Sequence, residues 1–332
     1  MRVTIKDIAR ELGLSESAVS LALNQRPGVS DATRQRVISC ARSLGYDRGH
    51  LRAHQEQSRT VLVAHYQKRI HTPVDFFSTL LSNAERELRK SGISLVSTVI
   101  DAGQNVIEQL EHHVDKGCTG VIVLATEMDE GDWHPFSQLH LPVVLLDTYL
   151  ATAEASCVTI HNREGARQAT QLLLSEGRGC PGFLGASLPL LNFKEREEGF
   201  LSAIQDAGYG TALAQRLILS PYVEGAETDL SSLLDAGLAP LSGYFAANDH
   251  IAIGAMRALQ AHGYRIPEDV SIVGFDNTQL ASYVTPSLTS VRVPLDYYAH
   301  IAAKLLLEAL ENVVSPLRIE VGTTLVRRAS TL

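Results

Sequence analysis

From residue 60 onward the chain alternates short apolar runs with amphipathic stretches, and this pattern restricts the possible folds most strongly. The apolar runs are mostly continuous, which is typical of strands buried on both faces of a parallel sheet. Between the runs, apolar residues recur at helical spacing, as in the series Phe77, Leu80, Leu81, Ala84 and Leu88. The alternation therefore predicts doubly wound α/β structure with parallel sheets.

The apolar runs form two series, which divide near residue 161. The first series predicts strands at 61–64, 93–100, 120–124, 143–146 and 157–160. The second series predicts strands at 182–185, 216–219, 243–246 and 270–275. Two series of this kind predict a body with two α/β lobes.

The first 45 residues follow a different pattern, that of three short helices. Thr4, Ser15 and Ser30 are good N-cap residues for them, and Gly13 and Gly45 stand where two of the helices should end. A helix, a tight turn with glycine and a second helix make the helix-turn-helix pattern. The second helix exposes short polar side chains that suit contacts with phosphates and base edges. Spacing alone leaves a structural or protein-binding three-helix module open.

The charge distribution separates this head from the body. The whole chain has a net charge of −8, which argues against nucleic acid, since phosphate binding needs clustered basic residues. Residues 1–59, however, contain ten basic and six acidic residues, for a net charge of +4. The remaining 19 basic and 31 acidic residues give the body −12. A basic head on an acidic body indicates two separate tasks in one chain.

The head also resembles a known family along its whole length. Residues 3–24 read VTIKDIARELGLSESAVSLALN, residues 28–37 read GVSDATRQRV and residues 41–46 read ARSLGY. This stretch closely resembles the head of the LacI/GalR family of bacterial repressors. The resemblance implies a helix-turn-helix domain over 1–46 whose second helix reads the major groove of an operator.

The resemblance also assigns DNA contacts by position. Base-reading positions would be Glu16, Ser17 and Leu21, where Leu21 replaces a frequent arginine and could contact a thymine methyl group. The remaining DNA-binding positions, mainly for phosphate contacts, would be Thr4, Ser15, Ser20, Asn24, Ser30 and Thr33. Because position 21 differs from the family, the operator sequence does not carry over.

Residues 47–60 are polar and form a linker by composition. In the family this place holds a hinge helix that inserts a leucine into the minor groove and kinks the DNA. Here Gln55 stands at the leucine position, and Leu51 is the nearest apolar residue. A hinge with a weakened kink and a plain flexible tether both remain open.

The family resemblance continues through the body. Its landmarks include residues 142–147 (PVVLLD), 196–200 (REEGF), 247–254 (ANDHIAIG), 273–276 (VGFD) and 286–291 (PSLTSV). They imply the two-lobed, doubly wound α/β fold of type I periplasmic binding proteins for an effector-binding and dimerisation domain over 61–332. The chain would cross between the lobes near residues 161, 290 and 320. Lobe one would then contain 61–160 and 291–320, and lobe two 161–290 and 321–332.

A ligand cleft is expected where the strands end. Asp147 and Asp276 each end an apolar strand, Asn248 follows another, and Arg196 begins a helix. Carboxylates, an amide and a guanidinium at the carboxyl ends of strands can bind the hydroxyl groups of a sugar. The predicted effector-binding residues are Phe76, Phe77, Asp147, Asn162, Arg196, Asn248 and Asp276. Each also has a structural alternative, such as helix capping by Asp147 or Asn248 or a surface ion pair of Arg196.

Other functional classes lack support in the sequence. No H-E-x-x-H, G-x-S-x-G or phosphate-loop motif occurs, so we expect no enzyme and no cofactor. The four cysteines form no C-x-x-C pair, so neither a metal site nor a disulfide framework is indicated. There is no secretion signal and no apolar run that could span a membrane, so a cytoplasmic location is expected. A secreted solute receptor would share the body but would need such a signal.

These observations predict a transcriptional regulator. The resemblance favours a repressor, and a ligand-responsive activator is the alternative. It would bind double-stranded operator DNA with two half-sites as a homodimer. A small effector, a sugar or a related metabolite, would bind between the lobes and change the affinity for DNA.

Overall fold

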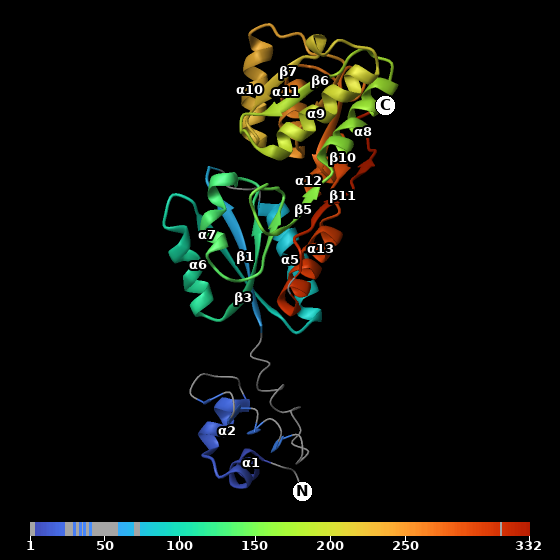
Figure 1. Ribbon diagram of the computed structural model, residues 1–332. Helices are drawn as coiled ribbons and strands as arrows, with labels where there is room; N and C mark the ends of the chain where they lie inside the picture. Colours follow the sequence, from blue (N-terminus) through green and yellow to red (C-terminus); the bar gives the residue numbers. More distant parts are fainter. Residues whose placement is uncertain are drawn as a thin grey trace. The chain divides into compact units, whose positions relative to one another are not determined.

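The computed structural model in Figure 1 describes residues 4–23, 29, 30, 33, 34, 36, 37, 40, 41, 59–69, 74–312 and 314–332. The chain divides into two compact units, residues 1–58 and 59–332. Most of the expected linker, including Leu51 and Gln55, lies outside the described residues, as does Asn24.

The first unit contains the expected pair of helices, α1 (Ile5–Leu12) and α2 (Glu16–Leu23). Gly13 ends α1 with φ +62°, a left-handed conformation that costs glycine little. The apolar sides of the helices make a small core, which also includes helical residues of the third expected segment. The buried members are Ile8, Ala9, Val19, Ala22, Leu23, Val37 and Ala41.

The second unit contains two six-stranded sheets, as the two series of apolar runs predicted. The first sheet is entirely parallel, in the order β11-β5-β4-β3-β1-β2. Its strands are β1 (Thr60–Gln67), β2 (Ser94–Asp101), β3 (Cys118–Leu124), β4 (Val143–Leu146), β5 (Ser156–Ile160) and β11 (Arg318–Val321). We call the part of the unit built on this sheet lobe one.

The second sheet, which defines lobe two, has the order β12-β10-β9-β8-β6-β7. All neighbours are parallel except β12, which runs antiparallel to β10. The strands are β6 (Gly182–Ala186), β7 (Arg216–Leu219), β8 (Gly243–Ala246), β9 (Ser271–Asp276), β10 (Thr289–Arg292) and β12 (Thr324–Val326).

Helices cover both faces of each sheet. Lobe one has α5 (Val74–Lys90), α6 (Val106–Asp115), α7 (His134–Ser137) and α13 (Leu295–Glu311); lobe two has α8 (Asn162–Ser175), α9 (Leu191–Asp206), α10 (Val223–Asp235), α11 (Asp249–Ala261) and α12 (Gln279–Tyr283). Short 3-10 turns lie at Glu130–Asp132 and Thr211–Leu213.

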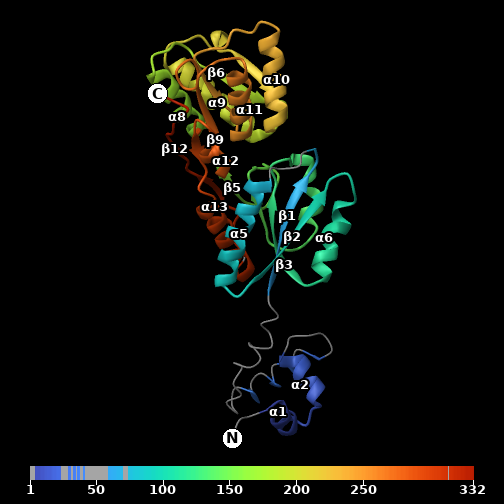
Figure 2. The ribbon, with the colours of Figure 1, turned by 180° about the vertical axis from the view of Figure 1, so that it is seen from behind.

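Alternate residues of β1 show how one strand serves two layers. Val61 and Val63 are buried in the core on the side of α5, while Leu62 and Ala64 belong to a second core with Leu110 of α6. Successive side chains of a strand point to opposite faces, so a strand covered on both faces is apolar throughout. Seen from behind, α5 and α13 lie side by side over lobe one (Figure 2).

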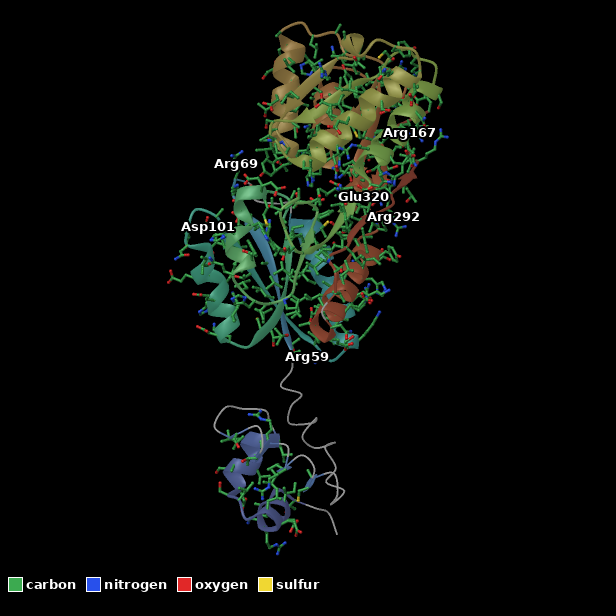
Figure 3. The ribbon with its side chains drawn as sticks, in the orientation of Figure 1. Arg59, Arg69, Asp101, Arg167, Arg292 and Glu320 are labelled. Atoms are coloured by element: carbon green, nitrogen blue, oxygen red, sulfur yellow. The ribbon has the colours of Figure 1, made fainter. Side chains whose placement is uncertain are left out.

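The chain passes between the lobes three times, and two of the crossings lie slightly later than expected. The first is at His161, between β5 and α8, where the sequence placed it. Residues 291 and 292, which we assigned to lobe one, pair with β9 in lobe two, because the parallel register continues as far as Arg292 opposite Asp276. The last crossing follows Val321, since β11 still pairs with β5 there. Arg292 and Glu320, labelled in Figure 3, mark this crossing region.

None of the helices in the described part of the chain is both long and apolar enough to cross a membrane.

Candidate ligand-binding cleft and DNA-binding helices

A cavity of about 720 Å³, including its open mouth, lies between the two lobes. Side chains at or beyond the carboxyl ends of strands form much of its wall, as expected for an α/β sheet. Five of the seven predicted effector residues line it: Phe76, Asp147, Arg196, Asn248 and Asp276. We call this cavity the inner pocket.

Several hydrogen bonds, an ion pair and an aromatic ring hold the side chain of Arg196 in place. It lies on α9 and is only 2% exposed. Its Nη1 donates to the Ala247 carbonyl at 2.7 Å, and its Nη2 lies 3.1 Å from Oδ1 of Asp276. The guanidinium carbon lies 3.7 Å from the ring centroid of Phe275. A buried guanidinium with this support is fixed in one orientation, so it can present its donors to a ligand at little entropic cost.

Asn162 and Phe77 do not line the inner pocket, but they support residues near it. The amide oxygen of Asn162 accepts from Nε of Arg196 at 3.0 Å, and its amide nitrogen donates to Glu195 at 2.9 Å. Phe77 stacks on His65 with a centroid distance of 4.9 Å. Asn162 is therefore placed to position Arg196 rather than to contact a ligand.

Asp147 has an unusual environment for a carboxylate. Its Oδ2 accepts from Thr126 at 2.8 Å and from Asn192 at 3.2 Å. Its Oδ1 is buried and has no hydrogen-bond partner among the described residues. Burial raises the pKa of Asp147 to about 6, although the nearby Arg196 acts in the opposite direction. Burying an acceptor without a donor costs free energy, and a ligand hydroxyl group that donates to this oxygen from the pocket would remove that cost.

Asn248 caps a helix and also lies in the wall of the inner pocket. It is the N-cap of α11, where its side-chain oxygen accepts from the amide of Ile251 at 2.8 Å. Its amide nitrogen donates to the carbonyl of Pro221 at 3.3 Å, and the residue also lines the inner pocket. The helix cap thus fixes a pocket residue at the end of β8.

The neighbouring Asp249 was not predicted and is fully buried. It accepts from Ser290 and from the amide and hydroxyl of Thr278. Burial, and then the nearby Asp276, raise the pKa of Asp249 to about 7. This carboxylate joins β10 and the segment after β9 to the start of α11, near the second crossing between the lobes.

Sequence reasoning also missed several other residues of the pocket wall. Many of them lie two or three residues beyond the end of a strand, so a slightly wider form of the rule that located Asp147 could have found them. They include Thr126 and Glu127 after β3, Tyr222 after β7 and Thr278 after β9. Asn192 and His250 are near the start of a helix instead.

In the first unit, the predicted DNA-contacting residues are found at helix starts and on α2. Ser15 accepts from the amide of Ala18 at 3.1 Å, and Ser30 accepts from the amide of Thr33 at 3.2 Å. The amide and hydroxyl of Thr4 both donate to Asp7. The cap interactions leave these side chains partly or fully exposed.

One side of α2 remains accessible while the other is buried. Glu16 and Ser17 are exposed, and Ser20 and Leu21 are half-buried. Val19, which lies between them in sequence, and Ala22, which follows them, are completely buried. Helical spacing therefore gathers the predicted base-reading residues on one accessible side, which suits a recognition helix.

Comparisons with known proteins agree with this division of the chain. Residues 4–48 match the family model described as bacterial regulatory proteins, lacI family, and residues 170–331 match a periplasmic binding protein-like domain. The HTH-type transcriptional regulator GalS of Salmonella typhimurium is 30% identical over 312 residues, which cover 92% of this chain and 89% of GalS.

Some solved structures resemble nearly the whole chain, and others cover about four fifths of it. The transcriptional regulator CelR in complex with cellobiose has a TM-score of 0.73 and 26% identity, covering 99% of this chain and 100% of CelR. A LacI family regulator from Enterococcus faecium with bound ribose has a TM-score of 0.71 and 26% identity, covering 81% of this chain and 98% of its own.

Proposed function

This chain belongs to the LacI family of bacterial regulatory proteins and is a DNA-binding transcriptional regulator rather than an enzyme, and we propose that it is a homodimeric repressor controlled by a sugar. The exposed side of α2 in each subunit would read one half-site of a pseudo-palindromic operator. The sugar would bind in the inner pocket between the lobes.

The observation that carries the effector assignment is the pairing of Arg196 with the unsatisfied Asp147. One is a fixed donor from lobe two and the other a fixed acceptor from lobe one. Vicinal hydroxyl groups can donate to a carboxylate and accept from a guanidinium at the same time. Such a ligand bridges the two lobes, which favours their closed arrangement.

Closure of the two lobes is the step through which the ligand would change the affinity for DNA. A ligand shifts a conformational equilibrium only by the difference between its affinities for the two states. Because the bridging contacts form fully only when the lobes are closed, the sugar stabilises that state. The resulting movement of lobe one in a dimer changes the spacing of the two heads and therefore their fit to the half-sites.

The Arg196→Ala substitution tests this proposal. An operator is first selected from random DNA with the full chain, and operator affinity is then measured by fluorescence anisotropy with and without a binding sugar. We expect the variant to bind the operator within a few fold of the wild type but to lose the response to sugar. Arg257→Ala, which removes a half-exposed arginine of α11, is the control and should keep the response.

Thermal unfolding of both variants verifies that the body remains folded, since Arg196 is buried. An Arg196→Ala protein that is folded and responds to sugar as the wild type does would refute the assignment of the site. A loss of operator affinity when the sugar binds would show that the sugar is an inducer. A gain of operator affinity would show that it is a co-repressor.

A further inference from the structure

The inner pocket is bordered by a second cavity of about 1220 Å³, including its open mouth. We call this cavity the outer pocket. The two pockets share five wall residues: Thr126, Glu127, Leu188, Leu190 and Phe193. Because they share these residues, the two pockets lie next to each other in one elongated cleft.

The wall of the outer pocket in lobe two is largely apolar. Leu191, at the first position of α9, is 39% exposed, and Ile218 of β7 is 59% exposed. Phe193 belongs to both pockets and continues this apolar surface inward. Pyranose rings have apolar C–H faces, and large apolar and aromatic side chains are the usual surfaces on which such faces pack.

Polar groups with spare hydrogen-bonding capacity surround this apolar wall. Arg69 follows β1 in lobe one, and Lys194 belongs to α9 in lobe two; both line the outer pocket. Their charged ends form no ion pair with another described residue. Lys68, by contrast, is already bound to Asp129 at 2.7 Å and to Asp132. In Figure 3, Arg69 lies at the rim of lobe one on the side that faces lobe two.

Glu127 fixes the junction between the two pockets. Its Oε2 accepts from the backbone amides of Lys68 at 3.3 Å and Arg69 at 2.6 Å. The inner pocket thus carries the carboxylates of Glu127, Asp147 and Asp276 against the single guanidinium of Arg196. This excess of acceptors favours a neutral, hydroxyl-rich ring over an anionic one.

We propose that the effector is a neutral oligosaccharide of at least two rings. The first ring occupies the inner pocket against Arg196 and Asp147, and the second ring packs on Leu191 and Ile218 in the outer pocket. Arg69 and Lys194 donate to its hydroxyl groups from opposite lobes, so the second ring also favours closure. This inference rests on the proposed function, because it specifies the ligand of the same cleft.

The test is isothermal titration of the full chain with monosaccharides and disaccharides. The panel contains glucose, galactose, mannose and xylose, together with cellobiose, maltose, lactose and xylobiose. We expect at least one disaccharide to bind about tenfold or more tightly than either of its constituent sugars. A monosaccharide that binds as tightly as every disaccharide, or the absence of binding by all eight sugars, would overturn the inference.

The Leu191→Glu variant tests the position of the second ring. A glutamate is well tolerated in the first turn of a helix, so α9 should remain intact. It should weaken disaccharide binding about tenfold and leave monosaccharide binding within about twofold. Leu233→Glu is the matched control, because Leu233 is a similarly exposed leucine on α10 and lines neither pocket. Equal weakening of both sugar classes by Leu191→Glu would contradict the two-ring arrangement.

These outcomes are distinct from a failure of the proposed function. A monosaccharide that binds most tightly and changes operator affinity would leave the proposed function standing and overturn the two-ring inference. A disaccharide that binds through Leu191 without any change in operator affinity would do the reverse.

Discussion

At the scale of single residues, the cleft contains groups whose placement reduces the stability of the fold. Asp147 has one buried oxygen that has no hydrogen-bond partner among the described residues, and Asp249 is a fully buried carboxylate. Burial raises the pKa of both groups, to about 6 and about 7. A protein retains such groups most often where they bind a ligand or set the balance between two states.

Replacing Asp147 by asparagine should therefore stabilise the body at neutral pH. Because the folded-state pKa of about 6 exceeds the ordinary value of 3.8, ionisation of Asp147 penalises the folded state above pH 6 and not below pH 4. We expect Asp147→Asn to raise the free energy of unfolding by up to about 3 kcal/mol at pH 7.5. Urea unfolding across the pH range checks this, and a stability difference that does not shrink toward pH 4 would be inconsistent with it.

Asn248 allows the helix cap to be separated from ligand binding. Asn248→Ala removes the acceptor for the amide of Ile251 and should cost about 1 kcal/mol of stability. Asn248→Ser also provides a cap acceptor and should restore most of that stability. Asn248→Asp loses the donor to the Pro221 carbonyl and adds a negative charge to an acidic pocket, so it should abolish sugar binding. Chemical denaturation and calorimetry measure the two effects. Equal destabilisation by Asn248→Ala and Asn248→Ser would mean that Asn248 does not act as a cap.

At the scale of helices and strands, continuous apolar runs made most of the fold predictable. Strands such as β3 and β8 are buried on both faces and so have a distinctive sequence. The three strands β10, β11 and β12 were missed, since each contains only one or two apolar residues and therefore no apolar run like those of the other strands. Their pairing depends on partners distant in sequence, which a local pattern does not encode.

The same limit applied to the site. Residues after strands could be located, because parallel strands end at a common edge. The choice between Phe76 and Phe77 required the rotation of α5 about its axis, which places only Phe76 in the pocket wall. Asn192 approaches Asp147 from the other lobe, so its contribution depends on how the lobes are arranged. Such contacts are set by tertiary structure alone.

The recognition helix α2 offers a prediction at this scale. Glu16 is exposed at its start, where a carboxylate repels phosphates but can accept from the amino group of cytosine. Glu16→Ala should weaken binding to the selected operator and strengthen binding to random DNA, reducing discrimination about tenfold. Glu11→Ala removes an exposed acid of α1 and is the control. Competition binding measures the affinities for the operator and for random DNA. If Glu16→Ala changes both affinities in the same direction and by the same factor, Glu16 does not read a base.

At the scale of the whole molecule, the separation of charge matters more than the total. A head of +4 and a body of −12 make the chain acidic overall, although the head itself is basic. The repulsion between an acidic body and DNA should weaken attachment to random sequences more than docking at an operator, where base contacts add affinity.

Neutralising part of the body tests this role of charge. Glu108, Glu111 and Asp115 are exposed acids of α6, and their replacement by the corresponding amides should strengthen binding to random DNA several-fold at low salt. The difference from the wild type should vanish at high salt, where charges are screened. An effect that persists at high salt, or no effect at low salt, would argue against electrostatic exclusion.

The central claim is that the head binds DNA through phosphate contacts and that a sugar in the cleft controls this binding. The most direct measurement is operator affinity of the full chain as a function of salt, from about 50 to 300 mM, with and without the best-binding sugar of the panel. The account predicts a steep decrease of affinity with salt, and a displacement of the whole curve by about tenfold or more when the sugar is present. A slope near zero, or two curves that coincide, would contradict it.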